Sequence, residues 1–169
     1  AAALALDVDV DEIDVTLGRT GAASAHRMAV TDRPDGVRIV DDAYNANPDS
    51  MRAALRALPS LAVGRRTIAV LGEMLELGEE SAAEHTELGR EVARAGVDVL
   101  VAVAPGAAAI ADGAAAEDPA RAADHAVADV DAARALLDDL VRGGDVVLFK
   151  GSNGSGIWRL ADAVTGGRA

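Results

Sequence analysis

Two polar loops contain the residue types that bind charged or polar ligands. The first, residues 41–48, reads D-D-A-Y-N-A-N-P, and the second, residues 150–156, reads K-G-S-N-G-S-G. Backbone amides at a helix N-terminus or in a glycine-rich turn favour anions. The second loop is not a P-loop, because the spacing G-x-x-x-x-G-K-[S/T] is absent. Asp, Asn and Pro also form ordinary strand-to-helix turns, so a purely structural role stays open at this point.

Each of these loops follows a strand-like segment and precedes a helical one. Residues 37–40 are rich in β-branched side chains, and apolar residues at i, i+3, i+4 and i+7 from Met51 predict a helix. Asn47 is a good N-cap for it, and Pro48 suits the first helical position. Residues 145–149 predict a buried strand with a helix after the glycine-rich turn. Both loops therefore leave the carboxyl end of a strand, where open α/β sheets bind ligands.

Strand and helix patterns alternate along most of the chain. The strand candidates span residues 26–30, 37–40, 67–71, 97–102, 124–127 and 145–149. The helix candidates span residues 48–58, 81–94, 105–116, 130–140 and 157–164. The turn Pro34-Asp35-Gly36 predicts a hairpin between the first two strands, and Ser81 with Glu84 predicts a capping box. The pattern predicts a three-layer, Rossmann-like α/β fold: a mostly parallel sheet with helices on both faces and an N-terminal hairpin strand.

Composition excludes several classes of function. The net charge of -12 argues against nucleic acid or an anionic membrane as the main partner. The chain has no cysteine, which excludes disulfides and thiolate metal sites. No apolar run is long enough to span a membrane, and the first residues lack the basic start of a signal peptide. We therefore expect a cytoplasmic protein with a core of Val, Leu, Ile and Ala.

A few chemically capable side chains stand outside the first loop. Lys150 is the only lysine among 16 basic residues, which suggests a retained role, although chance is the alternative. Glu73, Glu76 and His85 raise the question of a metal site, but their spacing matches no metal-binding template. We expect structural or solvated roles for these three and no metal site.

Three strings, in the same order along the chain, resemble the Mur ligase family. They are D-D-A-Y-N-A-N-P-D-S-M at 41–51, V-L-G-E-M-L-E-L-G-E-E-S at 70–81 with His85 following, and L-F-K-G-S at 148–152. The resemblance is to the branch that adds D-Ala-D-Ala to UDP-MurNAc-tripeptide, and it covers only about the last third of such a ligase. It implies that residues 1–25 are the tail of a preceding central domain with its linker, and that residues 26–169 are the C-terminal domain.

The resemblance implies an ATP-dependent amide-bond ligase that activates a carboxylate as an acyl phosphate for attack by an amine. Arg27 would contact the phosphates or ribose of ATP, Asp42 the ribose hydroxyls, and Asn45 also the nucleotide; an Arg fork suits phosphate oxygens and a carboxylate accepts from a diol. For the dipeptide the resemblance implies Asn45, Asn47, Pro48, Lys150 and Ser152. A basic residue often follows this Ser in the family, whereas Asn153 follows here.

The resemblance also implies what other parts of a ligase would contribute. Mg²⁺ and most of the ATP would be bound by the central domain, so we expect no catalytic residue in this chain and no activity from it alone. Its partners would be UDP-MurNAc-tripeptide, D-Ala-D-Ala and the rest of the same ligase. Two alternatives stay open: a folyl-polyglutamate-type ligase domain, and a stand-alone nucleotide-binding or interaction module without catalysis.

Overall fold

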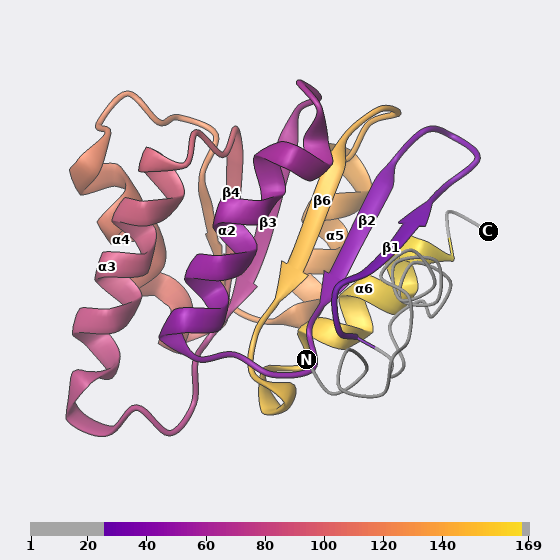
Figure 1. The fold of residues 1–169 in the computed structure, drawn as a ribbon. Helices are drawn as coiled ribbons and strands as arrows, with labels where there is room; N and C mark the ends of the chain where they lie inside the picture. The colour runs from indigo at the N-terminus through magenta and orange to yellow at the C-terminus, as the bar shows by residue number, and fades with distance from the viewer. Residues whose placement is uncertain (1–25, 167–169) are drawn as a thin grey trace, which may run out of the picture.

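A single six-stranded sheet forms the centre of the protein (Figure 1). The computed structural model describes residues 26–166, so the tail and linker expected over residues 1–25 lie outside the described residues. The strands are β1 (Ala29–Asp32), β2 (Arg38–Asp42), β3 (Thr67–Gly72), β4 (Val99–Val103), β5 (His125–Val127) and β6 (Val146–Lys150). Their order across the sheet is β1-β2-β6-β3-β4-β5. Only β1 runs antiparallel to its neighbour.

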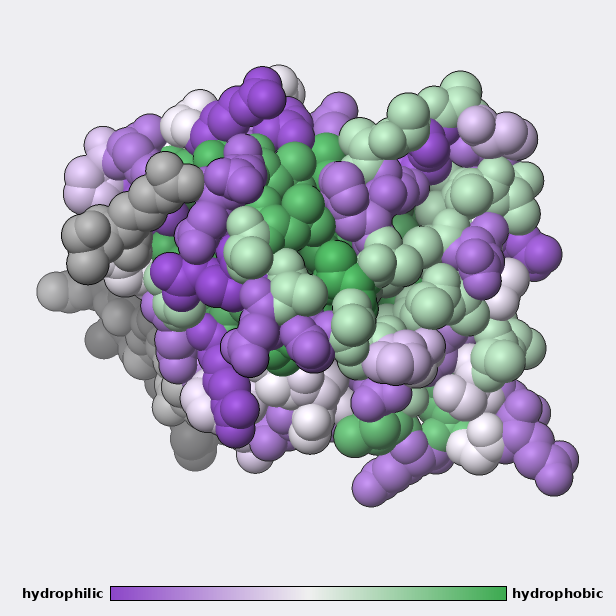
Figure 2. Space-filling model, turned by 180° about the vertical axis from the view of Figure 1, so that it is seen from behind, coloured by the Kyte–Doolittle hydropathy of each residue, from purple (hydrophilic) through white to green (hydrophobic). Residues whose placement is uncertain are grey.

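Helices cover both faces of this sheet, as the alternating pattern predicts. The helices are α2 (Pro48–Ala62), α3 (Ser81–Arg94), α4 (Ala108–Glu117), α5 (Val130–Leu140) and α6 (Ile157–Thr165). One apolar core lies between the sheet and α2, α3 and α4, and a second lies between the sheet and α5 and α6. Figure 2 shows the molecule from the α5 and α6 side, where hydrophilic residues surround apolar atoms near the centre. The three-layer fold class is confirmed.

The central strands are apolar throughout because both of their faces are covered. All residues of β3, β4 and β6 are buried, which matches the continuous Val, Leu and Ile runs of parallel strands. Burying such runs supplies about 25 cal/mol per Å² of apolar surface removed from water. This rigid, two-sided core holds the three strand ends from which the polar loops leave.

Two local expectations were wrong, and the backbone explains both. The first strand begins at Ala29 rather than at residue 26, because His26 and Met28 have positive φ angles of 62° and 48°. Ser81 forms no capping box, because the 3₁₀ turn Gly78–Glu80 leads straight into α3 and Ser81 is already helical. Asn47, in contrast, caps α2 as expected: its side chain accepts a hydrogen bond from the Ser50 amide.

Candidate functional site

Three strand ends lie side by side at the carboxyl edge of the sheet. In the ladder, Asp42 of β2 is the partner of Lys150 of β6, and Leu71 of β3 is the partner of Lys150 on the other side. The loops after β2, β3 and β6 therefore leave the sheet together. The two loops predicted to leave the carboxyl ends of strands thus lie at the same edge, together with the loop after β3, and open α/β folds bind ligands at such an edge.

The loop between β2 and α2 is held by its own polar side chains. Asn47 accepts a hydrogen bond from Ser50 N at 2.8 Å, and Ser50 Oγ accepts one from Asn47 N at 3.0 Å. Met51 N donates to the Asn47 carbonyl, and Pro48 has no N–H to offer. Most donors at this end of α2 are therefore already in use. An anion placed here would depend on side chains and on the helix dipole more than on free amides.

A first hollow opens between this loop and the start of β1. It has a volume of about 400 Å³ and is lined by Arg27, Met28, Asp42, Tyr44, Asn45, Asn47, Ser50 and Lys150. The Arg27 guanidinium lies 4.0 Å from the centre of the Tyr44 ring, a cation–π distance. Among the ion pairs of residues 26–166 none involves Arg27. Its donors are thus available to an anionic ligand.

The Asp42 carboxylate, in the lining of this first hollow, is fixed by two hydrogen bonds. Its Oδ1 accepts a hydrogen bond from Met28 N at 3.1 Å, and its Oδ2 accepts one from Lys150 Nζ at 2.5 Å. Each carboxylate oxygen has a second lone pair, so the group can still accept from a ligand hydroxyl. The orientation of the carboxylate is set before any ligand arrives.

A second hollow adjoins the first and shares two of its residues, Asn45 and Asn47. Its volume is about 420 Å³, and its lining is Asn45, Ala46, Asn47, Leu75, Glu76, Leu77, Ser152, Asn153 and Gly154. Residues of the three loops after β2, β3 and β6 therefore meet here. The lining mixes three neutral side-chain amides and one hydroxyl with two leucines and one carboxylate, which suits a small polar ligand more than a highly charged one.

The loop after β3 is held by a buried histidine of α3. Met74 N donates to His85 Nε2 at 2.8 Å, and His85 Nδ1 donates to the Ser81 carbonyl at 2.7 Å. His85 is 1% exposed, so both of its ring nitrogens are satisfied inside the protein. It lines neither hollow, and its observed contacts are structural.

Comparison with known proteins decides the family. The family described as "Mur ligase, glutamate ligase domain" matches residues 26–153. The chain belongs to the Mur ligase family.

Two similar relatives carry the same ligase name. A UDP-N-acetylmuramoyl-tripeptide–D-alanyl-D-alanine ligase of Mycobacterium leprae is 46% identical over 98% of this chain and 35% of its own length. The ligase of the same name from Mycobacterium tuberculosis (strain ATCC 25618 / H37Rv) is 47% identical over 97% of this chain and 36% of its own length. The chain thus spans about a third of these relatives.

Solved structures agree in fold. A MurF ligase from Thermotoga maritima in complex with ADP has a TM-score of 0.75 at 30% identity, over 98% of this chain and 35% of that chain. MurF from Acinetobacter baumannii has a TM-score of 0.80 at 31% identity, over 97% and 35%. A folylpolyglutamate synthase/dihydrofolate synthase from Yersinia pestis has a TM-score of 0.59 at 17% identity, over 94% and 35%. The last likeness shows the shared fold alone.

In this Mur ligase domain the residues expected at the nucleotide lie together. Arg27, Asp42 and Asn45 all line the first hollow. The residues expected at the dipeptide are divided. Asn45 and Asn47 line both hollows, Ser152 lines the second, and Lys150 lines the first. Pro48 occupies the first turn of α2 and lines neither.

Several lining residues of the Mur ligase domain were not singled out from the sequence. Ser50 lines the first hollow, and Leu75 and Leu77 line the second. The spacing Asn47-x-x-Ser50 is a capping signal that predicts a fixed loop end. Leu75 and Leu77 carry no chemical signal of their own, because their apolar side chains look like core until the fold is known.

A group of metal-ligand types lies on the opposite face of β2. The ligand atoms of His26, Asp41 and Asp162 lie within 4.8 Å of one another, the one such group found among residues 26–166. His26 Nδ1 and Asp41 Oδ2 already share a 2.7 Å hydrogen bond, and the His26 ring lies 5.8 Å from that of Trp158. Asp41 and Asp42 point to opposite faces because strand side chains alternate. This group is therefore separate from both hollows.

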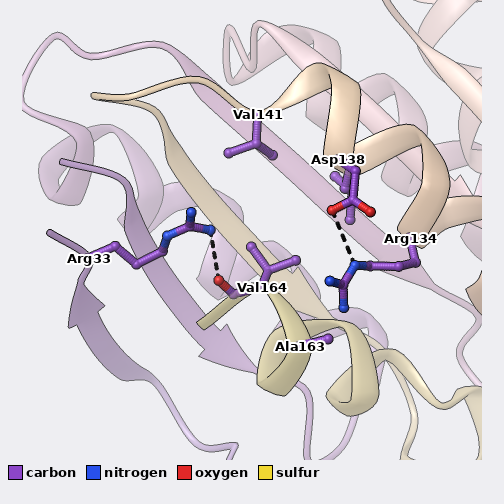
Figure 3. Close-up of a pocket in the computed structure, with 7 residues that line it drawn as sticks. Arg33, Arg134, Asp138, Val141, Ala163 and Val164 are labelled. Atoms are coloured by element: carbon purple, nitrogen blue, oxygen red, sulfur yellow. Dashed lines mark hydrogen bonds and ion pairs between the residues drawn. The ribbon is translucent and has the colours of Figure 1, made fainter. Parts of the chain in front are cut away.

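A third hollow, on the α5 and α6 side, differs in size and character (Figure 3). It measures about 30 Å³, close to the space of one water molecule. In it Arg33 donates to the Val164 carbonyl at 2.8 Å, and Arg134 donates to Asp138 at 3.3 Å. Its polar groups join the hairpin to α6 and one turn of α5 to the next. We assign it a packing role.

The resolved pKa shifts among acidic residues include two at exposed ion pairs away from the hollows. The Arg38 guanidinium hydrogen-bonds Asp32 and lowers the pKa of that carboxyl. Hydrogen bonds from Arg90 and then Arg94 lower the pKa of Glu87 on α3. These carboxylates stabilise helix and hairpin surfaces and touch neither hollow.

None of the helices in residues 26–166 is long and apolar enough to cross a lipid bilayer.

Proposed function

We propose that this chain is the C-terminal domain of an ATP-dependent ligase that adds D-Ala-D-Ala to UDP-MurNAc-tripeptide. The reaction would supply the cytoplasmic precursor of the peptidoglycan cell wall. The observation that carries the proposal is the pair of adjoining hollows that share Asn45 and Asn47. Joining a carboxylate to an amine requires both reactants and the nucleotide in one place, and two neighbouring sites on one rigid edge meet that need.

The first hollow suits the ribose and phosphates of ATP. Arg27 lies over the Tyr44 ring and has no ion-pair partner among residues 26–166, so its donors can bind phosphate although the net charge of the chain is -12. Asp42 is oriented by two donors and keeps lone pairs for hydroxyls. Asn45, on the same wall, adds an amide that both donates and accepts. The ADP complex of the Thermotoga maritima relative is in keeping with a nucleotide-binding role.

The second hollow suits a small dipeptide. Asn45, Asn47 and Ser152 place amide and hydroxyl groups in its lining. Pro48 follows Asn47 as the first residue of α2, and Lys150 lines the neighbouring first hollow. Glu76 places a carboxylate in the same lining, where a substrate ammonium would be favoured. Asn153 lies here too, in the position where a basic residue is common in the family, so neutral donors would have to bind the dipeptide carboxylate.

The chemistry would be completed by the rest of the ligase. ATP supplies the phosphoryl group that activates the tripeptide carboxylate, and Mg²⁺ would neutralise its charges from the central domain. The residues of this chain bind, orient and exclude water: Arg27 and Asp42 hold the nucleotide, and the second hollow aims the dipeptide amine. Of the two hollows' carboxylates, Asp42 is already bonded to Lys150, which argues against a metal ligand there.

Two experiments test this proposal. The isolated chain should release no phosphate above background from ATP with tripeptide precursor and D-Ala-D-Ala, and clear turnover would contradict that. In an NMR titration, D-Ala-D-Ala should shift the amides of residues 45–47 and 151–153, and Mg-ATP those around residues 27 and 42–45. The proposal fails if millimolar dipeptide shifts nothing, both in this chain and in the chain extended upstream through the central domain.

The same titration separates the alternative of a stand-alone nucleotide-binding or interaction module. Such a module would respond to Mg-ATP and give no response to D-Ala-D-Ala. A folyl-polyglutamate-type domain would respond to glutamate in place of the dipeptide. We favour the D-Ala-D-Ala reading because the relatives that cover nearly the whole chain bear that name.

A further inference from the structure

The Lys150–Ser152 turn, which begins at the last residue of β6, is buried, although Lys150 lines the first hollow and Ser152 lines the second. Lys150 is 2% exposed and Ser152 is 5% exposed, and Gly151 between them is also buried. β6 lies between β2 and β3 in the sheet. The Lys150–Ser152 turn therefore stands between the two loops that line the hollows. Lys150 makes hydrogen bonds to the first of these loops, and Ser152 makes hydrogen bonds to the second.

On one side Lys150 holds the loop after β2. Its Nζ donates to Asp42 Oδ2 at 2.5 Å, to the Asp42 carbonyl at 3.4 Å and to the Asn45 carbonyl at 3.1 Å. An ammonium group has three hydrogens, so these three acceptors use them all. No donor of Lys150 is left over for a substrate carboxylate.

On the other side Ser152 holds the loop after β3. Ser152 N donates to the Glu73 carbonyl at 3.1 Å, and Leu75 N donates to Ser152 Oγ at 2.9 Å. The backbone also comes very close here, since a Cβ on Gly151 would lie 3.1 Å from Gly72 Cα and 2.6 Å from Ser155 Oγ. The turn is thus packed tightly against the end of β3 and bonded to the loop beyond it.

We propose that the Lys150–Ser152 turn is a positioning device that sets the loops of both hollows relative to each other. Lys150 acts through Asp42 and the Asn45 carbonyl, and Ser152 acts through the Glu73–Leu75 segment. Lys150 is then a positioning residue and makes no contact with the dipeptide. This inference rests on the proposed function for the identity of the ligands, but its structural core, one turn fixing two loops, does not.

Hydrogen–deuterium exchange tests it without any ligand. Lys150→Met keeps the aliphatic stem and removes the three donors, and Ser152→Ala removes the acceptor of the Leu75 amide. In the ligase chain, K150M should speed exchange of amides 43–47 and S152A that of amides 74–77, each on the order of tenfold. Thr165→Ala is the matched control, because Thr165 Oγ1 donates to the Ala161 carbonyl within α6 and lines neither hollow. It should leave both loops unchanged.

The outcomes separate this inference from the proposed function. Unchanged exchange in both loops for K150M and S152A overturns the inference, whatever the enzyme does. If K150M unfolds the chain, Asp42→Asn removes only the carboxylate partner and must still loosen residues 43–47.

In the active ligase K150M should raise the KM for ATP as well as for D-Ala-D-Ala. A raised KM for the dipeptide alone, with protected loops, makes Lys150 a direct ligand instead. A wild-type ligase inactive with D-Ala-D-Ala refutes the proposed function only.

Discussion

The strand β2, which lies between β1 and β6 (Figure 1), carries an ion pair at each end, and the two pairs differ in burial. At its start Arg38 pairs with Asp32 across the hairpin, with side chains 28% and 59% exposed. At its end Asp42 pairs with Lys150 of β6, with side chains 17% and 3% exposed. Arg38 and Asp42 are four residues apart, so both lie on the same face of the strand.

Position in the fold explains this difference. Solvent and salt screen an exposed pair, and holding two long side chains costs entropy, so such pairs contribute little. Burying a lysine is costly unless every hydrogen finds an acceptor, and Lys150 finds three. A pair of this kind is weak evidence for stability but good evidence for a fixed geometry. It lies at the sheet edge where the loops of the site meet.

Breaking the two pairs one at a time gives the largest predicted effect. Lys150→Met leaves the Asp42 carboxylate partly buried without its cation, and removing one partner of a buried pair costs about 3–5 kcal/mol. Arg38→Met, the matched variant at the other end of β2, should change stability little. Urea denaturation of both variants measures the free energies of unfolding. Equal losses would mean that burial does not distinguish the two pairs.

Substituting Arg27 tests whether the carboxyl edge of the sheet binds the nucleotide. Arg27→Ala should weaken binding of Mg-ATP by roughly 10–100-fold, since a charge-assisted hydrogen bond to phosphate is worth about 1.5–3 kcal/mol. Arg159→Ala is the control, because Arg159 also lies over an aromatic ring, 5.2 Å from that of Trp158, and lines neither hollow. Calorimetric titration of the ligase with Mg-ATP compares them. Similar losses for both would remove Arg27 from the nucleotide site.

The hydrogen bond from Met74 N to His85 holds the loop after β3 without an ion pair, so it can be compared with the Lys150–Asp42 pair. His85→Leu leaves the Met74 amide buried without an acceptor, which should cost about 1–3 kcal/mol. His125→Leu is the control, because His125 lies half-buried on the short strand β5, far along the sheet. Denaturation should rank the loss of H85L below that of K150M and above that of H125L. A loss for H85L no larger than that of H125L would show that the Met74 bond contributes nothing.

The elements of this fold are visible in local patterns, but the anchoring contacts are not. The runs at 67–71 and 145–149 predict β3 and β6 nearly to the residue, because strands covered on both faces must be continuously apolar. The order of the strands across the sheet, in contrast, cannot be predicted from local patterns. That β6 lies between β2 and β3 follows from packing of the whole chain, and it brings Lys150 to Asp42 across 108 positions of sequence.

The candidate site likewise has features that the sequence predicts and features that it does not. The Asn47 cap is encoded within four residues and was predictable, as was the departure of loops 41–48 and 150–156 from the carboxyl ends of strands. The Ser81–Glu84 spacing misled, because the 3₁₀ turn before α3 occupies the place of a cap and cannot be read from those two residues. Lys150 uses its donors on Asp42 and Asn45. This depends on how the side chain is buried in the fold, which residue spacing in the sequence does not show.

The smallest effect concerns the exposed pair alone and depends on pH. The hydrogen bond from Arg38 lowers the pKa of Asp32 in the folded protein. The contribution of this carboxylate is therefore fully present above the pKa of Asp in the unfolded chain, about 3.9, and is lost as pH falls through the lower folded value. Asp32→Asn should lower the urea midpoint slightly at neutral pH, and the difference from wild type should vanish in acid.

High salt should erase this small difference between wild type and Asp32→Asn at neutral pH as well, because water and ions reach Asp32. The loss in K150M should survive the same salt, since Lys150 is 3% exposed in its side chain and ions cannot replace its hydrogen bonds. Urea curves for D32N and K150M at low and high salt measure both. If salt suppresses both losses alike, the Lys150 pair behaves as a surface ion pair, and the loops it contacts must be fixed by something else.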